Sequence, residues 1–388
     1  MYLKRMAEGE LISLLNAPKV IIVLGARQVG KTTLVKHVLS GKKYQLFNLD
    51  IEVDKQRVQA IASLPPIDAL KSIGNPDFIV IDEAQRLADA GRIVKGWFDA
   101  QIPVKIVLLG SSSLNLLNQS AESLTGRNEK LFLPPLLFRE IIENQSWYSS
   151  SLSDAQILEI FPAQIQELLI QNMVFGNYPE VSTTSDKTRY LLNLVSDYLL
   201  KDILQLGLVK TPDIIKRLLM LLAHQIGSEV SVSELANGLN ISRQTVERYL
   251  ALLEQTYVIF RLPAFSTNPR KEINKSHKIY FWDTGIRNAM LNDFSLNQLR
   301  ADIGALWENW VIAEFAKQNL LQGQRSRLFF WRSRSSGEVD LVIKKDEIIN
   351  AFEIKWKKQT INKRSFTARY GASVQLIDSS NPFIPVNL

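Results

Sequence analysis

Apolar and polar positions along the first part of the chain follow an alternating plan. Segments with helical spacing separate five short and almost wholly apolar runs, at residues 20–24, 44–49, 78–82, 104–109 and 130–133. Continuous apolar runs of this length are typical of strands buried on both faces, and their alternation with helices is typical of a parallel sheet. The pattern predicts an α/β domain over residues 1–148.

The following stretch, residues 149–212, shows helical spacing only. Its apolar residues recur at three- and four-residue intervals, as in Ile157, Ile160, Phe161, Ile165, Leu168 and Leu169. The segment Phe175-Gly-Asn-Tyr-Pro-Glu180 interrupts this pattern and divides the helices. We therefore predict an all-helical region.

Residues 213–285 carry the pattern of a winged helix. One amphipathic helix is predicted over 214–226 and a short one over 233–239, and Ser242 is a natural N-cap for a third. Apolar stretches at 256–262 and 278–281 are predicted to form the wing strands. The third helix of such domains commonly lies in a DNA major groove, but winged helices also bind proteins, and the pattern allows both.

Residues 286–388 begin with a helix over 305–314. Three strands are predicted after it, over 327–332, 337–343 and 351–355. The whole chain is thus predicted to belong to the α/β class, with four regions in sequence.

Composition narrows the class of protein. The 388 residues are 46% hydrophobic and 22% charged, enough for two to four domains with cores of their own. No apolar run approaches the roughly 20 residues of a membrane span, and the first residues lack the apolar region of a signal peptide. Without cysteine there is no disulfide or thiolate metal site. We expect a cytoplasmic protein with no membrane partner.

The net charge of +7 is unevenly distributed. Residues 1–265 hold 27 basic and 27 acidic residues, whereas residues 266–388 hold 19 basic and 12 acidic ones. A basic region attached to a neutral one suggests a polyanionic partner, most often nucleic acid, although solubility also explains an excess of this size.

The first apolar run leads into the sequence Gly25-Ala-Arg-Gln-Val-Gly-Lys-Thr32, which has Walker A spacing. In this motif backbone N–H groups surround a polyphosphate, Lys31 reaches the β- and γ-phosphates, and Thr32 offers its hydroxyl to Mg²⁺. We predict binding of ATP with Mg²⁺. The expected cofactor-binding residues are Gly25, Gln28, Val29, Gly30, Lys31, Thr32, Thr33, Asp82 and Ser112.

The third apolar run ends in Asp82 and Glu83, as a Walker B strand does. Asp82 is expected to hold the Mg²⁺ together with Thr32, and Glu83 to polarise the attacking water. The fourth run ends at Gly110-Ser-Ser-Ser113, where Ser112 is a candidate for contacting the γ-phosphate. ATP hydrolysis is the predicted activity, with Lys31 and Glu83 among its catalytic residues.

A second possible active centre lies near the carboxyl end. Asp340 is followed, after twelve residues, by Glu353-Ile-Lys355. Period-two alternation places Glu353 and Lys355 on one face of a strand, where Asp340, Glu353 and the helical Glu308 could hold a second Mg²⁺ while Lys355 orients a water. The arrangement resembles the PD-(D/E)xK nucleases, some of which keep the fold only to bind DNA. Val339 stands where that motif usually has proline.

Taken whole, the chain resembles AAA+ ATPases with an AAA_14 core and a DUF4143 carboxyl-terminal region. The motifs that carry the resemblance are the Walker segments, Leu124-Thr-Gly-Arg127, Gly176-Asn-Tyr-Pro-Glu180, Trp307-Glu-Asn309 and the Asp340 and Glu353 segments. The likeness implies that residues 149–212 are a helical lid. It also implies that Arg127 is an arginine finger acting on a neighbouring subunit.

These observations together predict an ATP-driven motor on branched or double-stranded DNA, in a plan similar to the bacterial motor of Holliday-junction branch migration. A homo-oligomeric ring, expected to be a hexamer, would recognise DNA structure more than sequence. The expected DNA-contacting residues are Arg243, Arg248, Arg332 and Arg334. A metal-dependent nuclease regulated by ATP and a nucleotide-switched signalling ATPase are the alternatives.

Overall fold

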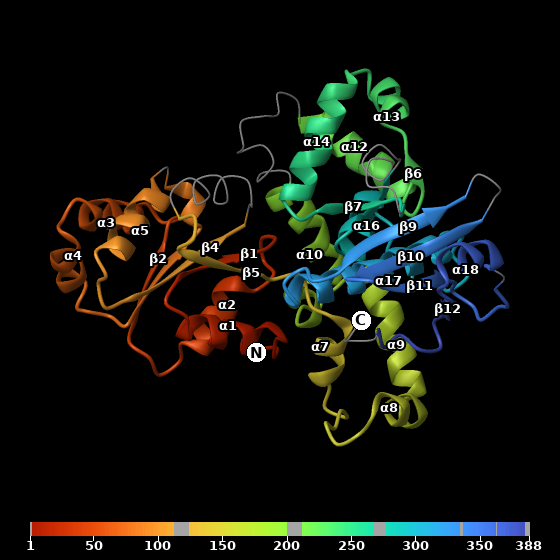
Figure 1. The fold of residues 1–388 in the computed structure, drawn as a ribbon, viewed down its shortest axis with the longest axis horizontal. Helices are drawn as coiled ribbons and strands as arrows, with labels where there is room; N and C mark the ends of the chain where they lie inside the picture. Colours follow the sequence, from red (N-terminus) through yellow and green to blue (C-terminus); the bar gives the residue numbers. More distant parts are fainter. Residues whose placement is uncertain are drawn as a thin grey trace. The chain divides into compact units, whose positions relative to one another are not determined.

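The structure, a computed structural model, describes residues 2–87, 89–111, 124–199, 212–266, 277–333, 337–361 and 363–384. These residues divide into two compact units, one formed by Tyr2–Pro134 and one that begins at Pro135. In Figure 1 the first unit is coloured red to orange, and the second continues from yellow to blue at the carboxyl end. We expected the first domain to extend to residue 148, so the division falls 14 residues earlier.

The first unit is a five-stranded parallel sheet with helices. Its strands follow the order β2-β3-β4-β1-β5 across the sheet. They are β1 (Val20–Leu24), β2 (Tyr44–Asn48), β3 (Phe78–Asp82), β4 (Lys105–Gly110) and β5 (Asn128–Phe132). All five predicted strands are therefore present. The apolar runs of β1, β3 and β4 are buried almost throughout, as expected for inner strands of a parallel sheet.

Helices connect β1 to β2, β2 to β3 and β3 to β4, as parallel pairing requires. The helical elements are α1 (Ala7–Asn16), α2 (Lys31–Val38), α3 (Glu52–Ala62), α4 (Pro66–Ser72), the 3₁₀ turn η1 (Ala84–Arg86) and α5 (Ala90–Asp99). In register, Leu24 of β1 pairs with Gly110 of β4, and Asn48 of β2 pairs with Asp82 of β3. The carboxyl ends of these strands therefore share one edge of the sheet.

The second unit begins with helices and continues into a winged-helix arrangement. The helical elements are α7 (Phe138–Glu143), α8 (Asp154–Ile160), α9 (Pro162–Phe175), η2 (Pro179–Ser182), α10 (Lys187–Asn193) and the π-helix η3 (Leu194–Leu199). The winged-helix elements are α12 (Pro212–His224), β6 (Glu229–Val230), α13 (Val232–Leu239), α14 (Arg243–Gln255), β7 (Ile259–Pro263) and β8 (His277–Phe281). Strands β6, β8 and β7 form an antiparallel sheet in that order.

The carboxyl-terminal elements complete this unit. They are α16 (Thr284–Leu291), α17 (Ile303–Leu321), β9 (Arg327–Arg332), β10 (Glu338–Lys345), β11 (Ile348–Ile354), α18 (Arg364–Tyr370) and β12 (Val374–Ile377). The sheet order is β12-β11-β10-β9, with β12 parallel to β11 and the other pairs antiparallel. The helix and three strands predicted here are present.

One hydrophobic core joins the three regions that we had expected to be separate domains. It contains Met173 of α9, Leu262 of β7, Trp307 of α17 and Phe330 of β9, all buried. A β-bridge between Ala264 and Phe330 also connects the wing strands to the carboxyl-terminal sheet. The helices expected as a lid thus bury their apolar face within the second unit, since α9 packs against α16 and α17.

The interruption at Gly176 has a structural cause. Gly176 has a φ of +73°, and a Cβ there would lie 2.0 Å from Oδ1 of Asp283. The backbone N–H of Asn177 donates to the buried Asp283 carboxylate over 2.7 Å. This segment therefore closes the end of α9 against α16.

Among the described residues, none of the helices combines the length and apolar character that a bilayer crossing needs.

Candidate active site

The Walker A segment connects β1 to α2 in a conformation that requires glycine. Gly30 has a φ of 93° and a ψ of 23°, in the left-handed region. At Gly25 a Cβ would lie 2.1 Å from the carbonyl oxygen of Leu133. The side chain of Lys31 is buried and its ammonium donates to the carbonyl oxygens of Gly25 and Ala26 over 2.9 and 2.8 Å. This cation therefore lies over the loop that is expected to hold the phosphates.

The other predicted residues of this loop differ in exposure. Val29 is fully buried, Gln28 is half-buried with a φ of 63°, and Thr33 is exposed on α2. Arg5, which the sequence did not indicate, stabilises the Walker A loop through hydrogen bonds to backbone carbonyl groups. The buried Arg5 donates to the carbonyl oxygens of Val29 and Pro134 over 2.8 and 2.7 Å. No local motif marks Arg5, because its partners are distant in sequence.

The end of β3 brings a carboxylate to the start of α2. The hydroxyl of Thr32 donates to Oδ2 of the buried Asp82 over 2.6 Å, and the backbone N–H of Glu83 donates to Oδ1 over 3.0 Å. Hydroxyl and carboxylate oxygens are the ligands that Mg²⁺ prefers. These residues therefore fit a Mg²⁺–nucleotide site, with Lys31 as the neighbouring cation.

Glu83 follows in a left-handed backbone conformation, with a φ of 54° and a ψ of 42°. The amide of Gln85 donates to its carboxylate and, over 3.1 Å, to the hydroxyl of Ser111. That hydroxyl in turn donates to Glu83 over 3.3 Å. Sequence reasoning missed Gln85 and Ser111. It indicated Ser112, which lies outside the described residues.

Arg127 precedes β5, and its carbonyl oxygen accepts a hydrogen bond from the backbone of Val20, the first residue of β1. It therefore lies at the amino-terminal edge of the sheet, opposite the Walker A loop. Its guanidinium contacts both carboxylate oxygens of Asp99, over 2.7 and 3.3 Å. Arg139, on α7 of the second unit, pairs with Asp154.

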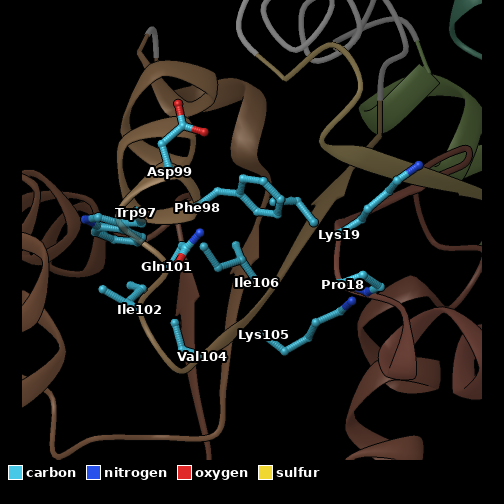
Figure 2. A pocket seen from close by; sticks show the side chains of 11 residues that line it. Pro18, Lys19, Trp97, Phe98, Asp99, Gln101, Ile102, Val104, Lys105 and Ile106 are labelled. Atoms are coloured by element: carbon cyan, nitrogen blue, oxygen red, sulfur yellow. The ribbon is translucent and has the colours of Figure 1, made fainter.

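A cavity of 480 Å³ opens at the same amino-terminal edge and is lined by Lys19, Asp99 and Lys105, among others. Figure 2 shows Lys19 and Lys105 on one side of it and Trp97 on the other. Burial lowers the pKa of Lys105. Because β1 runs from this edge to the Walker A loop, the cavity is separate from the nucleotide site.

In the second unit, β10 and β11 bring together the predicted Asp340, Glu353 and Lys355. The ammonium of Lys355 lies 3.1 Å from Oδ2 of Asp340 and 2.9 Å from Oε1 of Glu353, and both carboxylates are buried. A register shift in the pairing of β10 with β9 occurs between Val339 and Val342, at Asp340. Lys363 contacts the other oxygen of Glu353 over 2.8 Å.

Glu308, on α17, lies in a neighbouring group of charges. It accepts a hydrogen bond from Tyr280 over 2.6 Å and pairs over 3.3 Å with the buried Lys278, which also pairs with Glu338 over 2.7 Å. Across the described part of the chain, no group of three or more His, Asp or Glu side chains is placed to hold a metal ion. Lysines contact the three predicted carboxylates: Lys278 pairs with Glu308, and Lys355 pairs with Asp340 and Glu353. Metal binding by these carboxylates stays a prediction.

Burial and neighbouring charge shift the pKa values in this region. Burial, together with the charge of Asp340, raises the pKa of Glu308 to about 7, against the opposing effect of Lys278. Burial lowers the pKa of Lys355, but Asp340 and Glu353 outweigh it and the net pKa is raised. Lys355 is therefore a fixed cation, whereas Glu308 changes charge near neutral pH.

The predicted DNA-contacting residues differ in their surroundings. Arg243 and Arg248 are exposed on α14. Arg332 pairs with Glu229 of β6 over 2.6 Å, and Arg334 lies outside the described residues. On the same strand as Arg332, the side chains of Phe329, Phe330 and Trp331 are all buried. Strand β9 carries core side chains on both faces, because separate clusters cover Phe330 and Phe329.

Comparison with known proteins agrees with the nucleotide site. The AAA_14 family model, an AAA domain, matches residues 17–142, and the DUF4143 model, a domain of unknown function, matches residues 303–380. The chain is a P-loop ATPase of the AAA_14/DUF4143 family. A third model, DUF8612, also a domain of unknown function, matches residues 166–297 of this ATPase.

Relatives of this AAA_14/DUF4143 ATPase occur in bacteria and archaea. An uncharacterized protein of Mycobacterium tuberculosis is 29% identical over 358 residues, which are 91% of this chain and 74% of the relative. One from Methanocaldococcus jannaschii is 27% identical over 336 residues, which are 84% of this chain and 72% of the relative. Among solved structures, the Walker-type ATPase of Pyrococcus abyssi matches with a TM-score of 0.48 and 14% identity, over 75% of this chain and 96% of that one.

Proposed function

We propose that this ATPase is a motor that binds branched or double-stranded DNA and is driven by ATP hydrolysis. The observation that carries the hydrolytic part is the approach of Thr32 to Asp82 at 2.6 Å, with Glu83 next in the chain. The DNA part is supported by the winged-helix arrangement of α12 to β8 and by the basic excess after residue 265.

Each residue of the pocket has a defined task in this proposal. Lys31 leaves the carbonyl oxygens of Gly25 and Ala26 and contacts the β- and γ-phosphates. Thr32 and Asp82 hold the Mg²⁺, which supplies charge neutralisation of the phosphates when bound. Glu83, released from Gln85 and Ser111, orients the attacking water and accepts its proton.

We further propose a homo-oligomer, with a hexameric ring as the expected form, in which Arg127 serves a neighbouring subunit. The five residues of β1, at about 3.3 Å each, separate Arg127 from the Walker A edge by roughly 15 Å. Because Arg127 lies at the edge of the sheet opposite the Walker A loop, it is better placed to act on the nucleotide of a neighbouring subunit than on the nucleotide of its own subunit. Arg127 would first leave Asp99.

DNA binding is assigned to the winged helix and the basic region that follows it. Arg243 and Arg248 are the two arginines of α14 and both are exposed, and so small a set supports contact with the phosphate backbone better than base recognition. Arg332 could contribute only by giving up its ion pair with Glu229. Recognition of DNA structure rather than sequence fits this small set of cations.

A second candidate function is metal-dependent cleavage of DNA by the carboxyl-terminal region. Its support is the convergence of Asp340, Glu353 and Lys355, with Lys355 within 3.1 Å of both carboxylates. The helix α17, the strand β9 and the hairpin β10–β11 also follow one another in the helix–strand–hairpin order that supports the PD-(D/E)xK resemblance. Cleavage would require Mg²⁺ to displace the lysine from one carboxylate.

The test of the main proposal is ATPase activity measured without DNA, with linear duplex and with a four-way junction. Stimulation by the junction supports a motor that recognises branched DNA, and stimulation by both supports a general duplex motor. Slow hydrolysis that ignores every DNA, with no DNA binding at low salt, contradicts the proposal and favours the nucleotide-switched signalling protein.

A further inference from the structure

A strongly basic segment follows directly on the strand that carries Glu353. Residues 355–377 contain six basic residues and no acidic one: Lys355, Lys357, Lys358, Lys363, Arg364 and Arg369. The whole chain has a net charge of only +7. This short segment therefore carries a charge almost equal to that of the entire protein.

Four of these cations are presented to solvent. Lys357 and Lys358 are exposed in the connection that leaves β11, and Arg364 and Arg369 are exposed on α18. The helix is held in place by Phe366, which is fully buried and packs edge-on against Trp331 at 5.2 Å between ring centroids. We call the four exposed cations the 357–369 basic surface.

The remaining two lysines connect this surface to the carboxylates of the second candidate site. Lys355 contacts Asp340 and Glu353. Lys363, which precedes α18, contacts Glu353 over 2.8 Å and donates to the carbonyl oxygen of Glu338 over 2.5 Å. The exposed cations are thus next in sequence to lysines that are fixed on the buried carboxylates.

We propose that the 357–369 basic surface binds the phosphate backbone of duplex DNA and holds it beside Asp340 and Glu353. This inference rests on the proposed function and names the surface that makes the contact. Contacts from lysine and arginine to phosphate dominate the affinity of proteins for DNA and do not depend on the base sequence. Such contacts are suited to a protein that recognises the structure of DNA and not its sequence.

The chemistry of the surface favours a nucleic acid over a lipid surface. Membrane-surface binding combines cations with large apolar side chains that enter the bilayer. Among the described residues of this segment, the exposed side chains other than the cations are small or polar, such as Gln359, Thr360, Ser365 and Thr367. The surface therefore offers charge and hydrogen bonds without an apolar anchor.

The test measures duplex binding by a variant with Lys357→Gln, Lys358→Gln and Arg369→Gln, across a series of salt concentrations. Each phosphate contact contributes about 0.9 to the slope of log affinity against log salt. We expect the slope to fall by about 2 to 3 and the affinity at low salt to fall by roughly 10- to 100-fold. ATPase activity without DNA should equal that of the wild type, and an unchanged Tm and circular-dichroism spectrum show that the second unit is folded.

A matched control removes three exposed cations of the first unit, by Arg57→Gln, Lys71→Gln and Arg92→Gln, and so changes the net charge equally. The control should keep the wild-type slope. Equal slopes of log affinity against log salt in the wild type, the control and the variant with Lys357→Gln, Lys358→Gln and Arg369→Gln would overturn the inference. Wild-type protein that binds no duplex would instead contradict the proposed function. Tighter binding of anionic vesicles than of duplex, lost in the Lys357 variant, would also overturn the DNA assignment.

Discussion

The hydroxyl of Thr32 lies 2.6 Å from a carboxylate oxygen of Asp82, although fifty positions separate the two residues in sequence. Parallel pairing in the order β3-β4-β1 brings the end of β3 near the loop after β1. Two hard oxygen ligands are therefore in contact within the fold, and this relationship is the basis of the predictions on ATP hydrolysis.

Glu83→Gln should separate nucleotide binding from hydrolysis. Loss of a general base typically lowers the rate by about 10²- to 10⁴-fold, so we expect kcat to fall by that amount while the Kd for ATP stays within about twofold. Lys31→Ala should instead remove binding itself. Fluorescent-nucleotide titration and phosphate release measure the two effects. Equal kcat in Glu83→Gln and wild type would exclude Glu83 as the base.

Gly25→Ala should destabilise the first unit and weaken ATP binding. The added Cβ would meet the Leu133 carbonyl oxygen at 2.1 Å, and such overpacking typically costs about 1–3 kcal/mol of unfolding free energy. Gly9→Ala, in the first turn of α1 with nothing within 4 Å, is the control and should stabilise by about 0.4–1 kcal/mol. Urea unfolding compares them, and equal effects would mean that the close approach at Gly25 is unimportant.

Arg127→Ala should lower ATP hydrolysis by about 10³-fold or more if this residue acts as an arginine finger. Folding should be little affected, because an exposed ion pair such as that with Asp99 contributes at most about 1 kcal/mol. Mixing Arg127→Ala with Lys31→Ala subunits should restore part of the activity, since one supplies the pocket and the other the arginine. No recovery in mixed oligomers of verified composition would argue against action between subunits.

Asp340→Ala should abolish any cleavage of DNA with Mg²⁺ or Mn²⁺. The buried carboxylate contacts Lys355 and accepts a hydrogen bond from the backbone N–H of Ile354 over 2.8 Å, so its loss removes a proposed metal ligand and one of the two carboxylates that contact Lys355. Gel assays on duplex and junction DNA measure the effect. Cleavage at the wild-type rate by Asp340→Ala would contradict a role for Asp340 in the reaction, and absence of cleavage in the wild type would favour a binding platform.

Glu308→Gln should change how stability depends on pH. The pKa of Glu308 is raised from 4.5 to about 7 in the folded protein, so the folded state binds more protons than the unfolded state between these values. By linkage, this group makes the protein less stable as pH rises from about 4.5 to 7. The glutamine variant lacks this loss.

The Tm of Glu308→Gln minus that of the wild type should therefore increase from pH 5 to pH 8, measured with EDTA present. Glu347→Gln, in the turn between β10 and β11, is a suitable control because its side chain is exposed to solvent. A Tm difference that stays constant across this range would contradict the burial of Glu308 beside Asp340.

Sequence reasoning reached the Walker residues because their spacing is local. The loop from Gly25 to Thr32 must bend tightly after a buried strand, and few other sequences satisfy that need. Gln85, Ser111 and Arg5 were missed for the opposite reason. Their partners are set by the order of strands in the sheet, which no short motif records.

By itself the sequence determined the strands of the first unit, the helices and wing strands of the second, and the candidate nucleotide pocket, because hydrophobic periodicity and glycine spacing act over a few residues. Only the tertiary structure decided that helices α7 to α9 share a core with α17 and the last sheet. It also decided that Lys278 pairs with Glu308, and that Lys355 and Lys363 occupy the carboxylates of Asp340 and Glu353. Such long-range burial and charge pairing depend on which apolar faces meet, and that choice is made by the whole chain at once.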